Sequence, residues 1–281
     1  MSGFELVAEG PLSTARLQLH HIHTRPLGVS SGRVLLLGGS NFDVSLKRQF
    51  LSTSLVEQFE VVTYEPRGIG RTKGLNPPWT MSDYAQDALA CLDAIGWDHA
   101  HIVGESFGGM TALQVALRAP QRVDRMVIAS AAAGGACGSS FDISKFLELT
   151  RPEAAAAAMA LQDTRWIDIK ESEPDHYAQA LAVREQFEEA FAPSLETGGY
   201  AALLDARRDH DVCRALGQIT TPTLVCAGLR DRQAPPEVQE RLALGLVGGK
   251  YAAFDAGHGL LFSHGKAMEE AIKHLREGGR R

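Results

Sequence analysis

A serine at position 106 stands in the spacing that nucleophilic catalysis requires. The segment from Gly104 to Gly108 reads Gly-Glu-Ser-Phe-Gly; it follows a short apolar run and precedes a stretch rich in small residues. A serine that turns sharply off the end of a strand needs neighbours without side chains two positions to either side, and both glycines meet this need. The helix expected next aims its N-terminus at the site, which favours developing negative charge. We therefore predict that Ser106 is a nucleophile.

A serine hydroxyl needs a general base, and that base needs a third group to orient it. His258 stands between two glycines just past the last expected strand, and Asp231 lies in the loop after the preceding one. Ligand chemistry collects in such loops, at the carboxyl ends of parallel strands. Asp255 is a rival acid, but it is too near His258 in the chain and is expected on the wrong side. We expect Ser106, His258 and Asp231 to act together.

The elements that must position these residues alternate between strands and helices. An alternating stretch at 17–23 indicates an antiparallel start, and continuous apolar runs, typical of strands buried on both faces, follow from residue 33 onward. The runs lie at 34–37, 61–64, 102–103, 126–129, 224–226 and 251–254, and helix-period stretches lie at 45–59, 81–95, 107–119, 235–246 and 266–276. This rhythm predicts an α/β fold with a mostly parallel central sheet and helices on both faces.

The rhythm breaks once, between residues 139 and 208, where the sequence predicts helices and no strand. Because both flanks return directly to the sheet pattern, we interpret 139–208 as a helical cap inserted after the sixth strand. Residues 1–138 and 209–281 are then the two parts of one core domain. A single large domain with an insertion also fits a length of 281 residues.

The order Ser106, Asp231, His258, with an insertion after the sixth strand, resembles the α/β-hydrolase superfamily over nearly the whole chain. The segment 61–72 also resembles that family's D-x-R-G-x-G-x-S segment. The resemblance implies a serine hydrolase. The segment 67–74 is neither a dinucleotide fingerprint nor a P-loop, so no cofactor is expected. Members with a similar cap include carboxylesterases, enol-lactonases and hydrolases that cleave carbon–carbon bonds. Family dehalogenases and epoxide hydrolases are disfavoured, because they carry an aspartate in place of the serine.

The resemblance further implies an oxyanion hole. The segment 35–40 stands where the family usually carries His-Gly followed by an oxyanion residue, so the backbone N–H groups of Ser40 and Phe107 are the implied donors. The sequence departs from the family at Gly38, where histidine is common and usually braces this loop. Asn41 or the hydroxyl of Ser40 are further candidates for the second donor.

The resemblance and the apolar character of small-molecule sites predict a substrate that is a small ester, lactone or related acyl compound, apolar or aromatic. We expect Gly39, Asn41 and Trp166 to contribute to its pocket. A role as a lyase, as a cofactor-free perhydrolase or as a slow-turnover receptor stays open, because one fold supports many functions. The aromatic residues that could line the pocket from the cap are Phe141, Phe146, Trp166, Tyr177, Phe187, Phe191 and Tyr200.

Composition excludes several partners. A net charge of −6 and the lack of clustered Lys and Arg argue against nucleic acid, and no apolar stretch approaches the length that spans a bilayer. His20, His21 and His23 do not share one strand face, and no ligand spacing follows them, so no metal site is predicted. The first residues show no secretory signal pattern, and four cysteines without CxxC spacing indicate reduced thiols in the cytoplasm.

Overall fold

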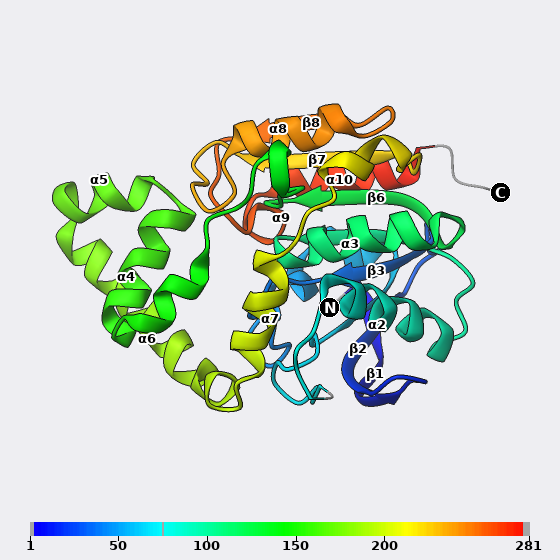
Figure 1. Cartoon of the computed structure of the whole chain (residues 1–281), viewed down its shortest axis with the longest axis horizontal. Helices are drawn as coiled ribbons and strands as arrows, with labels where there is room; N and C mark the ends of the chain where they lie inside the picture. The colour runs from blue at the N-terminus through cyan, green and yellow to red at the C-terminus, as the bar shows by residue number, and fades with distance from the viewer. Residues whose placement is uncertain (1–2, 75, 278–281) are drawn as a thin grey trace.

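The computed structural model describes residues 3–74 and 76–277, and within them one eight-stranded sheet runs through the molecule in the order β1-β2-β4-β3-β5-β6-β7-β8 (Figure 1). β1 and β2 form an antiparallel hairpin, and β2 pairs antiparallel with β4; the pairs from β4 to β8 are all parallel. The mostly parallel sheet expected from the sequence is confirmed. The strands are Phe4–Ser13 (β1), Gln18–Pro26 (β2), Arg33–Leu37 (β3), Glu60–Tyr64 (β4), Ala100–Glu105 (β5), Val123–Ala129 (β6), Thr223–Gly228 (β7) and Lys250–Phe254 (β8).

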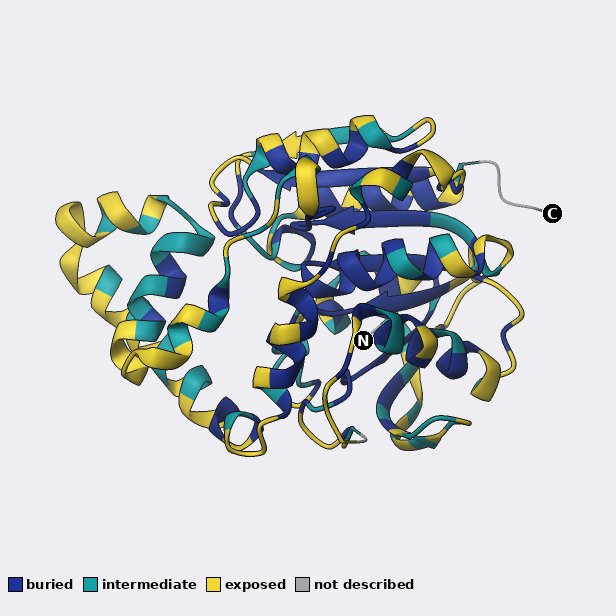
Figure 2. Ribbon diagram, viewed as in Figure 1, coloured by how far each residue is buried: buried dark blue, intermediate teal, exposed yellow. Residues whose placement is uncertain are grey.

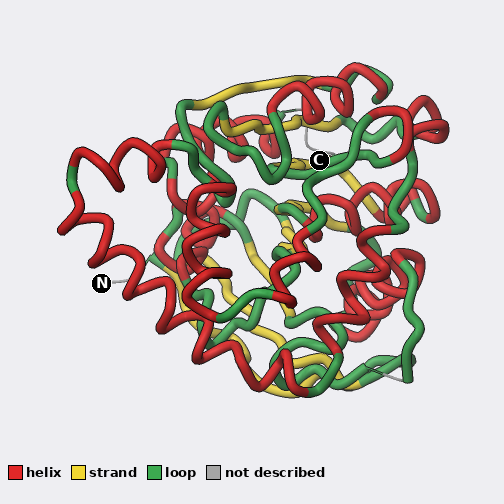
Figure 3. The backbone as a smooth tube through the Cα atoms, turned by 60° about the vertical axis from the view of Figure 1, so that its left-hand side comes forward, coloured by secondary structure: helices red, strands yellow, loops and turns green. Residues whose placement is uncertain are grey.

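The central strands are buried on both faces, which explains their continuous apolar runs. Every residue of β5 and of β7 is buried, and Figure 2 shows these strands as the buried centre of the molecule. One face packs against α2 (Met81–Ala94), α3 (Phe107–Arg118) and α8 (Pro236–Gly245), and the other packs against α1 (Ser54–Gln58) and α10 (Gly265–Arg276). Figure 3, coloured by secondary structure, shows helices packed around the strands.

The helix expected at 45–59 is wrong in extent. The structure has only a short 3-10 helix, η1 (Gln49–Ser52), and the five-residue α1 there. Thr53 breaks the run: its backbone is extended, and its hydroxyl donates to the carbonyl of Phe50 at 2.7 Å. The apolar residues that produced the helical period, among them Phe50 and Leu55, are nevertheless buried. The residues before η1 form a loop, and this loop reaches the region around Ser106.

The chain between β6 and β7 is helical, as expected. It contains α4 (Arg151–Gln162), α5 (Arg165–Ser172), α6 (Pro174–Glu196) and α7 (Gly199–Arg208), with the 3-10 helices η3 (Gly135–Cys137), η4 (Ile143–Glu148) and η5 (Cys213–Gln218) at its ends. Figure 1 shows α4, α5 and α6 standing to one side of the sheet, while α7 returns to the core. Many residues of α5 and α6 are exposed (Figure 2). Among the helices of residues 3–74 and 76–277, none combines the length and the apolar character of a membrane-spanning helix.

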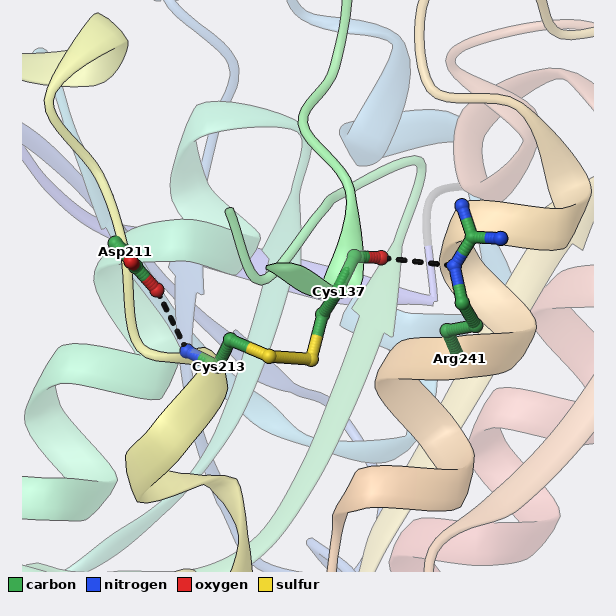
Figure 4. Close-up of a disulfide and its surroundings, with 4 residues drawn as sticks. All are labelled: Cys137, Asp211, Cys213 and Arg241. Atoms are coloured by element: carbon green, nitrogen blue, oxygen red, sulfur yellow. Dashed lines mark hydrogen bonds between the residues drawn. A yellow bond between two sulfur atoms is a disulfide. The ribbon is translucent and has the colours of Figure 1, made fainter. Parts of the chain in front are cut away.

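A disulfide corrects the expectation that the cysteines are reduced. Cys137 and Cys213 are bonded to each other across 76 residues of sequence (Figure 4). They meet because the chain entering and the chain leaving the helical segment run together: the N–H of Val212 donates to the carbonyl of Ala133 at 2.8 Å. Spacing along the sequence could not show this proximity. Cys91 and Cys226 are free and buried, and each belongs to a hydrophobic core cluster.

We expect the double variant Cys137→Ser, Cys213→Ser to be less stable than the oxidised protein by about 4 kcal/mol, because the bond removes chain entropy from the unfolded state over a long loop. Urea unfolding followed by circular dichroism measures this difference. The control is the wild type in reductant, which should match the double variant. Equal unfolding free energies of the variant and the oxidised wild type would contradict the stabilising role.

Candidate active site

Ser106 lies at a sharp turn between β5 and α3. Its backbone has φ 55° and ψ −117°, a left-handed conformation that costs a non-glycine residue energy. The turn depends on close backbone approach: a Cβ on Gly104 would lie 2.5 Å from the carbonyl oxygen of Gly108, and a Cβ on Gly108 would overlap the carbonyl of Leu37. The two glycines singled out in the sequence therefore allow this turn, which holds the serine side chain at the edge of the sheet.

Three loops bring Ser106, His258 and Asp231 together. His258 follows β8 and Asp231 follows β7. The Oγ of Ser106 lies 2.9 Å from Nε2 of His258, and Nδ1 of the same ring lies 2.8 Å from Oδ2 of Asp231. With the ring proton on Nδ1, the serine hydroxyl donates to the imidazole and the imidazole donates to the carboxylate. The geometry is that of a proton relay from the hydroxyl to the ring.

The loop after β7 holds the Asp231 carboxylate firmly. Its Oδ1 accepts hydrogen bonds from the backbone N–H groups of Gln233 and Ala234, at 2.8 and 2.9 Å, which leaves Oδ2 for His258. The side-chain nitrogen of Gln233, Nε2, also lies 3.0 Å from Nε2 of His258. Sequence reasoning missed Gln233, although its place two residues after the predicted acid was a signal that it could reach the site.

The rival acid points elsewhere. Asp255 is exposed, and its carboxylate accepts from Nε of Arg230 at 2.7 Å. That hydrogen bond lowers the pKa of Asp255. No ion pair joins it to His258 in the described part of the chain, which agrees with the expectation that it lies on the wrong side.

The implied oxyanion donors border the same site. Phe107 is the first residue of α3, so its N–H has no partner inside the helix, and Ser40 lies in the loop after β3. Ser40 is buried, and its hydroxyl has no hydrogen-bond partner among the described residues. The departure at Gly38 has a physical reason: a Cβ there would overlap the ring of Phe42, so the ring occupies the space that a side chain would need. The oxyanion hole itself stays a prediction.

A cavity of about 570 Å³ opens above Ser106 and His258. Core residues form its floor, and α4, α6 and η4 contribute to its walls. Gly39 and Asn41 line it, as expected, but Trp166 does not: it packs between α5 and α6, with its ring 5.6 Å from that of His176. Of the seven aromatic candidates only Phe146 and Tyr200 line the cavity; the others lie elsewhere in the helical segment, among them Phe187, stacked on Phe191.

The cavity carries more charge than an apolar substrate would call for. Lys47, Arg184, Glu188 and Glu105 all line it. The Nζ of Lys47 donates to the side-chain oxygen of Asn41 at 2.5 Å, and burial lowers the pKa of Lys47 to about 8. Arg184 pairs with Glu188 at 2.6 Å. The sequence did not reveal these groups, because only the folded chain turns them toward Ser106.

Glu105 is a carboxyl group whose pKa is strongly raised. It directly precedes Ser106 and is buried, and its Oε1 has no hydrogen-bond partner in the described chain. Burial raises the pKa of Glu105 to about 7, although the nearby His258 and Lys47 act to lower it. At neutral pH the carboxyl group is therefore divided between its neutral and its charged form.

We expect Glu105→Gln to change how stability depends on pH. The folded-state pKa of about 7 lies above the ordinary value of 4.5, so the folded chain binds more protons between these pH values and its stability falls as the pH rises from about 4.5 to about 7. The full loss is on the order of 3 kcal/mol. Urea unfolding at pH 5 and pH 8 should show the variant gaining stability relative to the wild type at pH 8. The exposed Glu57→Gln is the control, and an identical pH trend in all three proteins would refute the expectation.

Comparison with known proteins identifies the family. A family profile described as the alpha/beta hydrolase fold matches residues 35–157. The protein named "Putative carbamate hydrolase RutD" from Variovorax paradoxus is 31% identical over 232 residues, which cover 80% of this chain and 84% of that protein. This chain belongs to the α/β-hydrolase family. A protein of the same name from Caulobacter vibrioides is 28% identical to this α/β-hydrolase over 236 residues, which cover 80% of this chain and 83% of that protein.

Solved structures share the fold of this α/β-hydrolase. The enol-lactonase from Burkholderia xenovorans LB400 aligns with a TM-score of 0.76 and 23% identity, over 95% of this chain and 100% of that one. The 2-hydroxy-6-oxo-6-phenylhexa-2,4-dienoate hydrolase from Rhodococcus sp. strain RHA1 aligns with a TM-score of 0.77 and 20% identity, over 97% and 99% of the two chains. At these identities the likeness concerns the fold, and the substrate must be argued from the site.

Proposed function

We propose that this α/β-hydrolase cleaves a small ester, lactone or related acyl substrate, with Ser106 as nucleophile, His258 as general base and acid, and Asp231 as the group that orients the histidine. The observation that carries the proposal is the unbroken line of hydrogen bonds from Ser106 Oγ through the ring of His258 to Asp231. The Ser106 and His258 side chains both border the large cavity, so a bound substrate would reach them.

In the proposed reaction, Ser106 Oγ forms a bond to the carbonyl carbon while its proton passes to Nε2 of His258. Asp231 stabilises the imidazolium through Nδ1. The N–H groups of Ser40 and Phe107 are proposed to stabilise the oxyanion of the tetrahedral intermediate by several kcal/mol. His258 then protonates the departing oxygen as its bond to carbon breaks, which leaves an acyl-enzyme. Water, deprotonated by the same ring, then attacks the acyl carbon. The bond between that carbon and Oγ breaks as His258 returns the proton to Oγ, which releases the acid and free Ser106.

We propose that residues 139–208 act as a cap that closes over the substrate, with 1–138 and 209–281 as the core. Hydrogen bonds tie the end of α4 to the two loops that carry the acid and the base: the N–H of His258 donates to the carbonyl of Gln162 at 2.6 Å, and the N–H of Arg232 donates to the carbonyl of Leu161 at 3.0 Å. The size of the cavity suits a small-molecule substrate. Its charged lining favours a substrate with polar groups beside its acyl carbon over a wholly apolar one.

A carbamate is the second candidate substrate, because relatives that match four fifths of the chain carry the name of carbamate hydrolases. Ser106 would attack a carbamate carbonyl, with His258 and Asp231 in the same roles as above. A carbamoyl-enzyme would then form in place of the acyl-enzyme. Cleavage of a carbon–carbon bond is a further alternative, since one solved structure of this fold is a dienoate hydrolase. The cytoplasmic location stays a prediction, and the disulfide weighs against it because structural disulfides are rare in that compartment.

The test combines turnover with covalent labelling. We expect steady multiple turnover of short p-nitrophenyl esters, and a serine-directed phosphonate should add one mass increment, located on Ser106 by peptide mass spectrometry. Parallel assays with p-nitrophenyl carbamates rank the two substrate classes. A receptor would show at most one turnover per molecule, and a phosphonate adduct on another residue, or none, would refute the assigned nucleophile.

A further inference from the structure

The chain buries two arginine side chains in very different surroundings. Arg67 is 2% exposed and pairs with Asp87, with Nε and Nη2 donating to its two carboxylate oxygens at 2.7 and 2.6 Å. Arg207 is 4% exposed and has no carboxylate within ion-pair distance among residues 3–74 and 76–277. A buried charge without a partner is costly, whereas a paired one is compensated. The structure therefore leaves Arg207 in need of a counter-charge.

The contacts of Arg207 are all with neutral groups. Its Nη2 donates to the hydroxyl of Ser140 at 2.7 Å and to the carbonyl of Phe141 at 2.9 Å, while its Nε is buried with no hydrogen-bond partner in the described residues. His210 lies beside it, 5% exposed, and burial lowers its pKa to about 4. The carbonyl of Ala132 is close to that ring, but neither of its nitrogens makes a hydrogen bond of good geometry within the described chain. The Nε–H group of Arg207 is therefore a donor without a hydrogen-bond partner in the described residues.

Arg207 and His210 both line a second cavity of about 170 Å³, separate from the one above Ser106. It lies where the chain enters and leaves the helical segment, between the end of β6, the start of 139–208 and the end of α7. This volume exceeds by far the roughly 10–15 Å³ that one water needs, so a small anion has room to enter. Its lining consists of Met110, Ala132, Gly134, Ser139, Ser140, Asp142, Arg207, Arg208 and His210.

The lining of this cavity carries two arginines and one carboxylate, and further carboxylates lie just outside it. Arg208 is half exposed; its Nη1 lies 2.9 Å from Asp205 and its Nε lies 3.9 Å from Asp209. Asp142 is the one carboxylate in the lining, and its Oδ1 accepts from the backbone N–H and the hydroxyl of Ser144, at 3.1 and 2.7 Å. Its charge acts on Arg207 from a distance, without an ion pair, and it opposes an incoming anion. Removing that charge should therefore strengthen anion binding.

We propose that this cavity binds a small inorganic oxyanion, phosphate or sulfate, as the counter-ion of Arg207. The guanidinium of Arg207, the hydroxyls of Ser139 and Ser140, and Arg208 line the cavity, and such groups are the donors that an oxyanion prefers. The anion bridges the start and the end of the helical segment, next to the Cys137–Cys213 disulfide that joins the same two connections. The site is independent of Ser106 and of the proposed hydrolysis.

The experiment measures the thermal midpoint of the oxidised full chain in sodium phosphate, in sodium sulfate and in sodium chloride, at constant ionic strength and pH. We expect a saturable rise with phosphate or sulfate, by about 3 °C at ten times the dissociation constant, and none with chloride. Isothermal titration calorimetry with phosphate should give one site per chain. No saturable effect of either oxyanion would overturn the proposal, because the cavity would then hold water only.

Variants locate the site. Arg207→Gln should abolish the oxyanion effect, Arg208→Gln should weaken it severalfold, and Asp142→Asn should tighten it severalfold, since asparagine keeps the oxygen that Ser144 needs. Arg214→Gln, at an exposed arginine on η5, is the control and should change nothing. If Arg207→Gln fails to fold, the Asp142→Asn titration decides: tighter binding supports the site, and unchanged binding overturns it. An undiminished effect in a folded Arg207→Gln variant also overturns it.

Discussion

Replacing Ser106 with alanine should lower kcat for a short p-nitrophenyl ester by about 10⁴-fold or more while the fold is kept. The hydroxyl is the group that bonds to the carbonyl carbon in the proposed reaction, and without it His258 has no proton to accept from the nucleophile. Alanine needs the same left-handed backbone as serine, so the strain at the turn is unchanged. Steady-state kinetics measures the loss, and circular dichroism checks the fold.

Ser130 supplies a matched control for this experiment. It too is a buried serine at the end of a parallel strand, with a left-handed φ of 53°, and its hydroxyl has no hydrogen-bond partner in the described chain. It does not belong to the line of bonds through His258. Ser130→Ala should keep kcat within a few fold of the wild type. An equal loss in both variants would mean that the turn geometry, and not the hydroxyl of Ser106, is responsible.

Asp231→Asn should lower kcat by about 10⁴-fold, because the asparagine would hold His258 in the wrong tautomer. Two backbone N–H groups hold Oδ1 of Asp231, so the asparagine oxygen will take that place and its NH₂ group will face Nδ1. The ring must then accept at Nδ1 and carry its proton on Nε2, where it can no longer accept a proton from Ser106. Kinetics gives the loss, and a crystal structure should show the ring unmoved.

Asp255→Asn is the control for the acid, because this carboxylate is three residues from His258 in the chain yet pairs with Arg230 on the surface. Its activity should match that of the wild type. A large loss in Asp255→Asn together with a small one in Asp231→Asn would reverse the assignment of the acid. Similar small losses in both would show that the orientation of His258 does not depend on a carboxylate.

Local sequence carried the information for the framework. The parallel strands follow from apolar runs that only burial on both faces explains, and the turn at Ser106 follows from two glycines whose backbones must touch other backbone. These are properties of neighbours along the chain. The helix expected at 45–59 was wrong because a helical period of buried residues is also produced by a broken, loop-containing segment that packs on the same face.

The positions of the candidate catalytic residues along the fold could be predicted from the amino-acid sequence: a serine after β5, an acid after β7 and a histidine after β8, all at the same edge of a parallel sheet. The surroundings of these residues depend on the folded chain. Tertiary structure placed Gln233 against the imidazole, turned Trp166 away from the cavity, joined Cys137 to Cys213 and buried Arg207 without an ion-pair partner in the described chain. The reason is that strand and turn patterns depend on residues near in sequence, whereas the lining of a cavity depends on segments that meet only after the chain between them has folded.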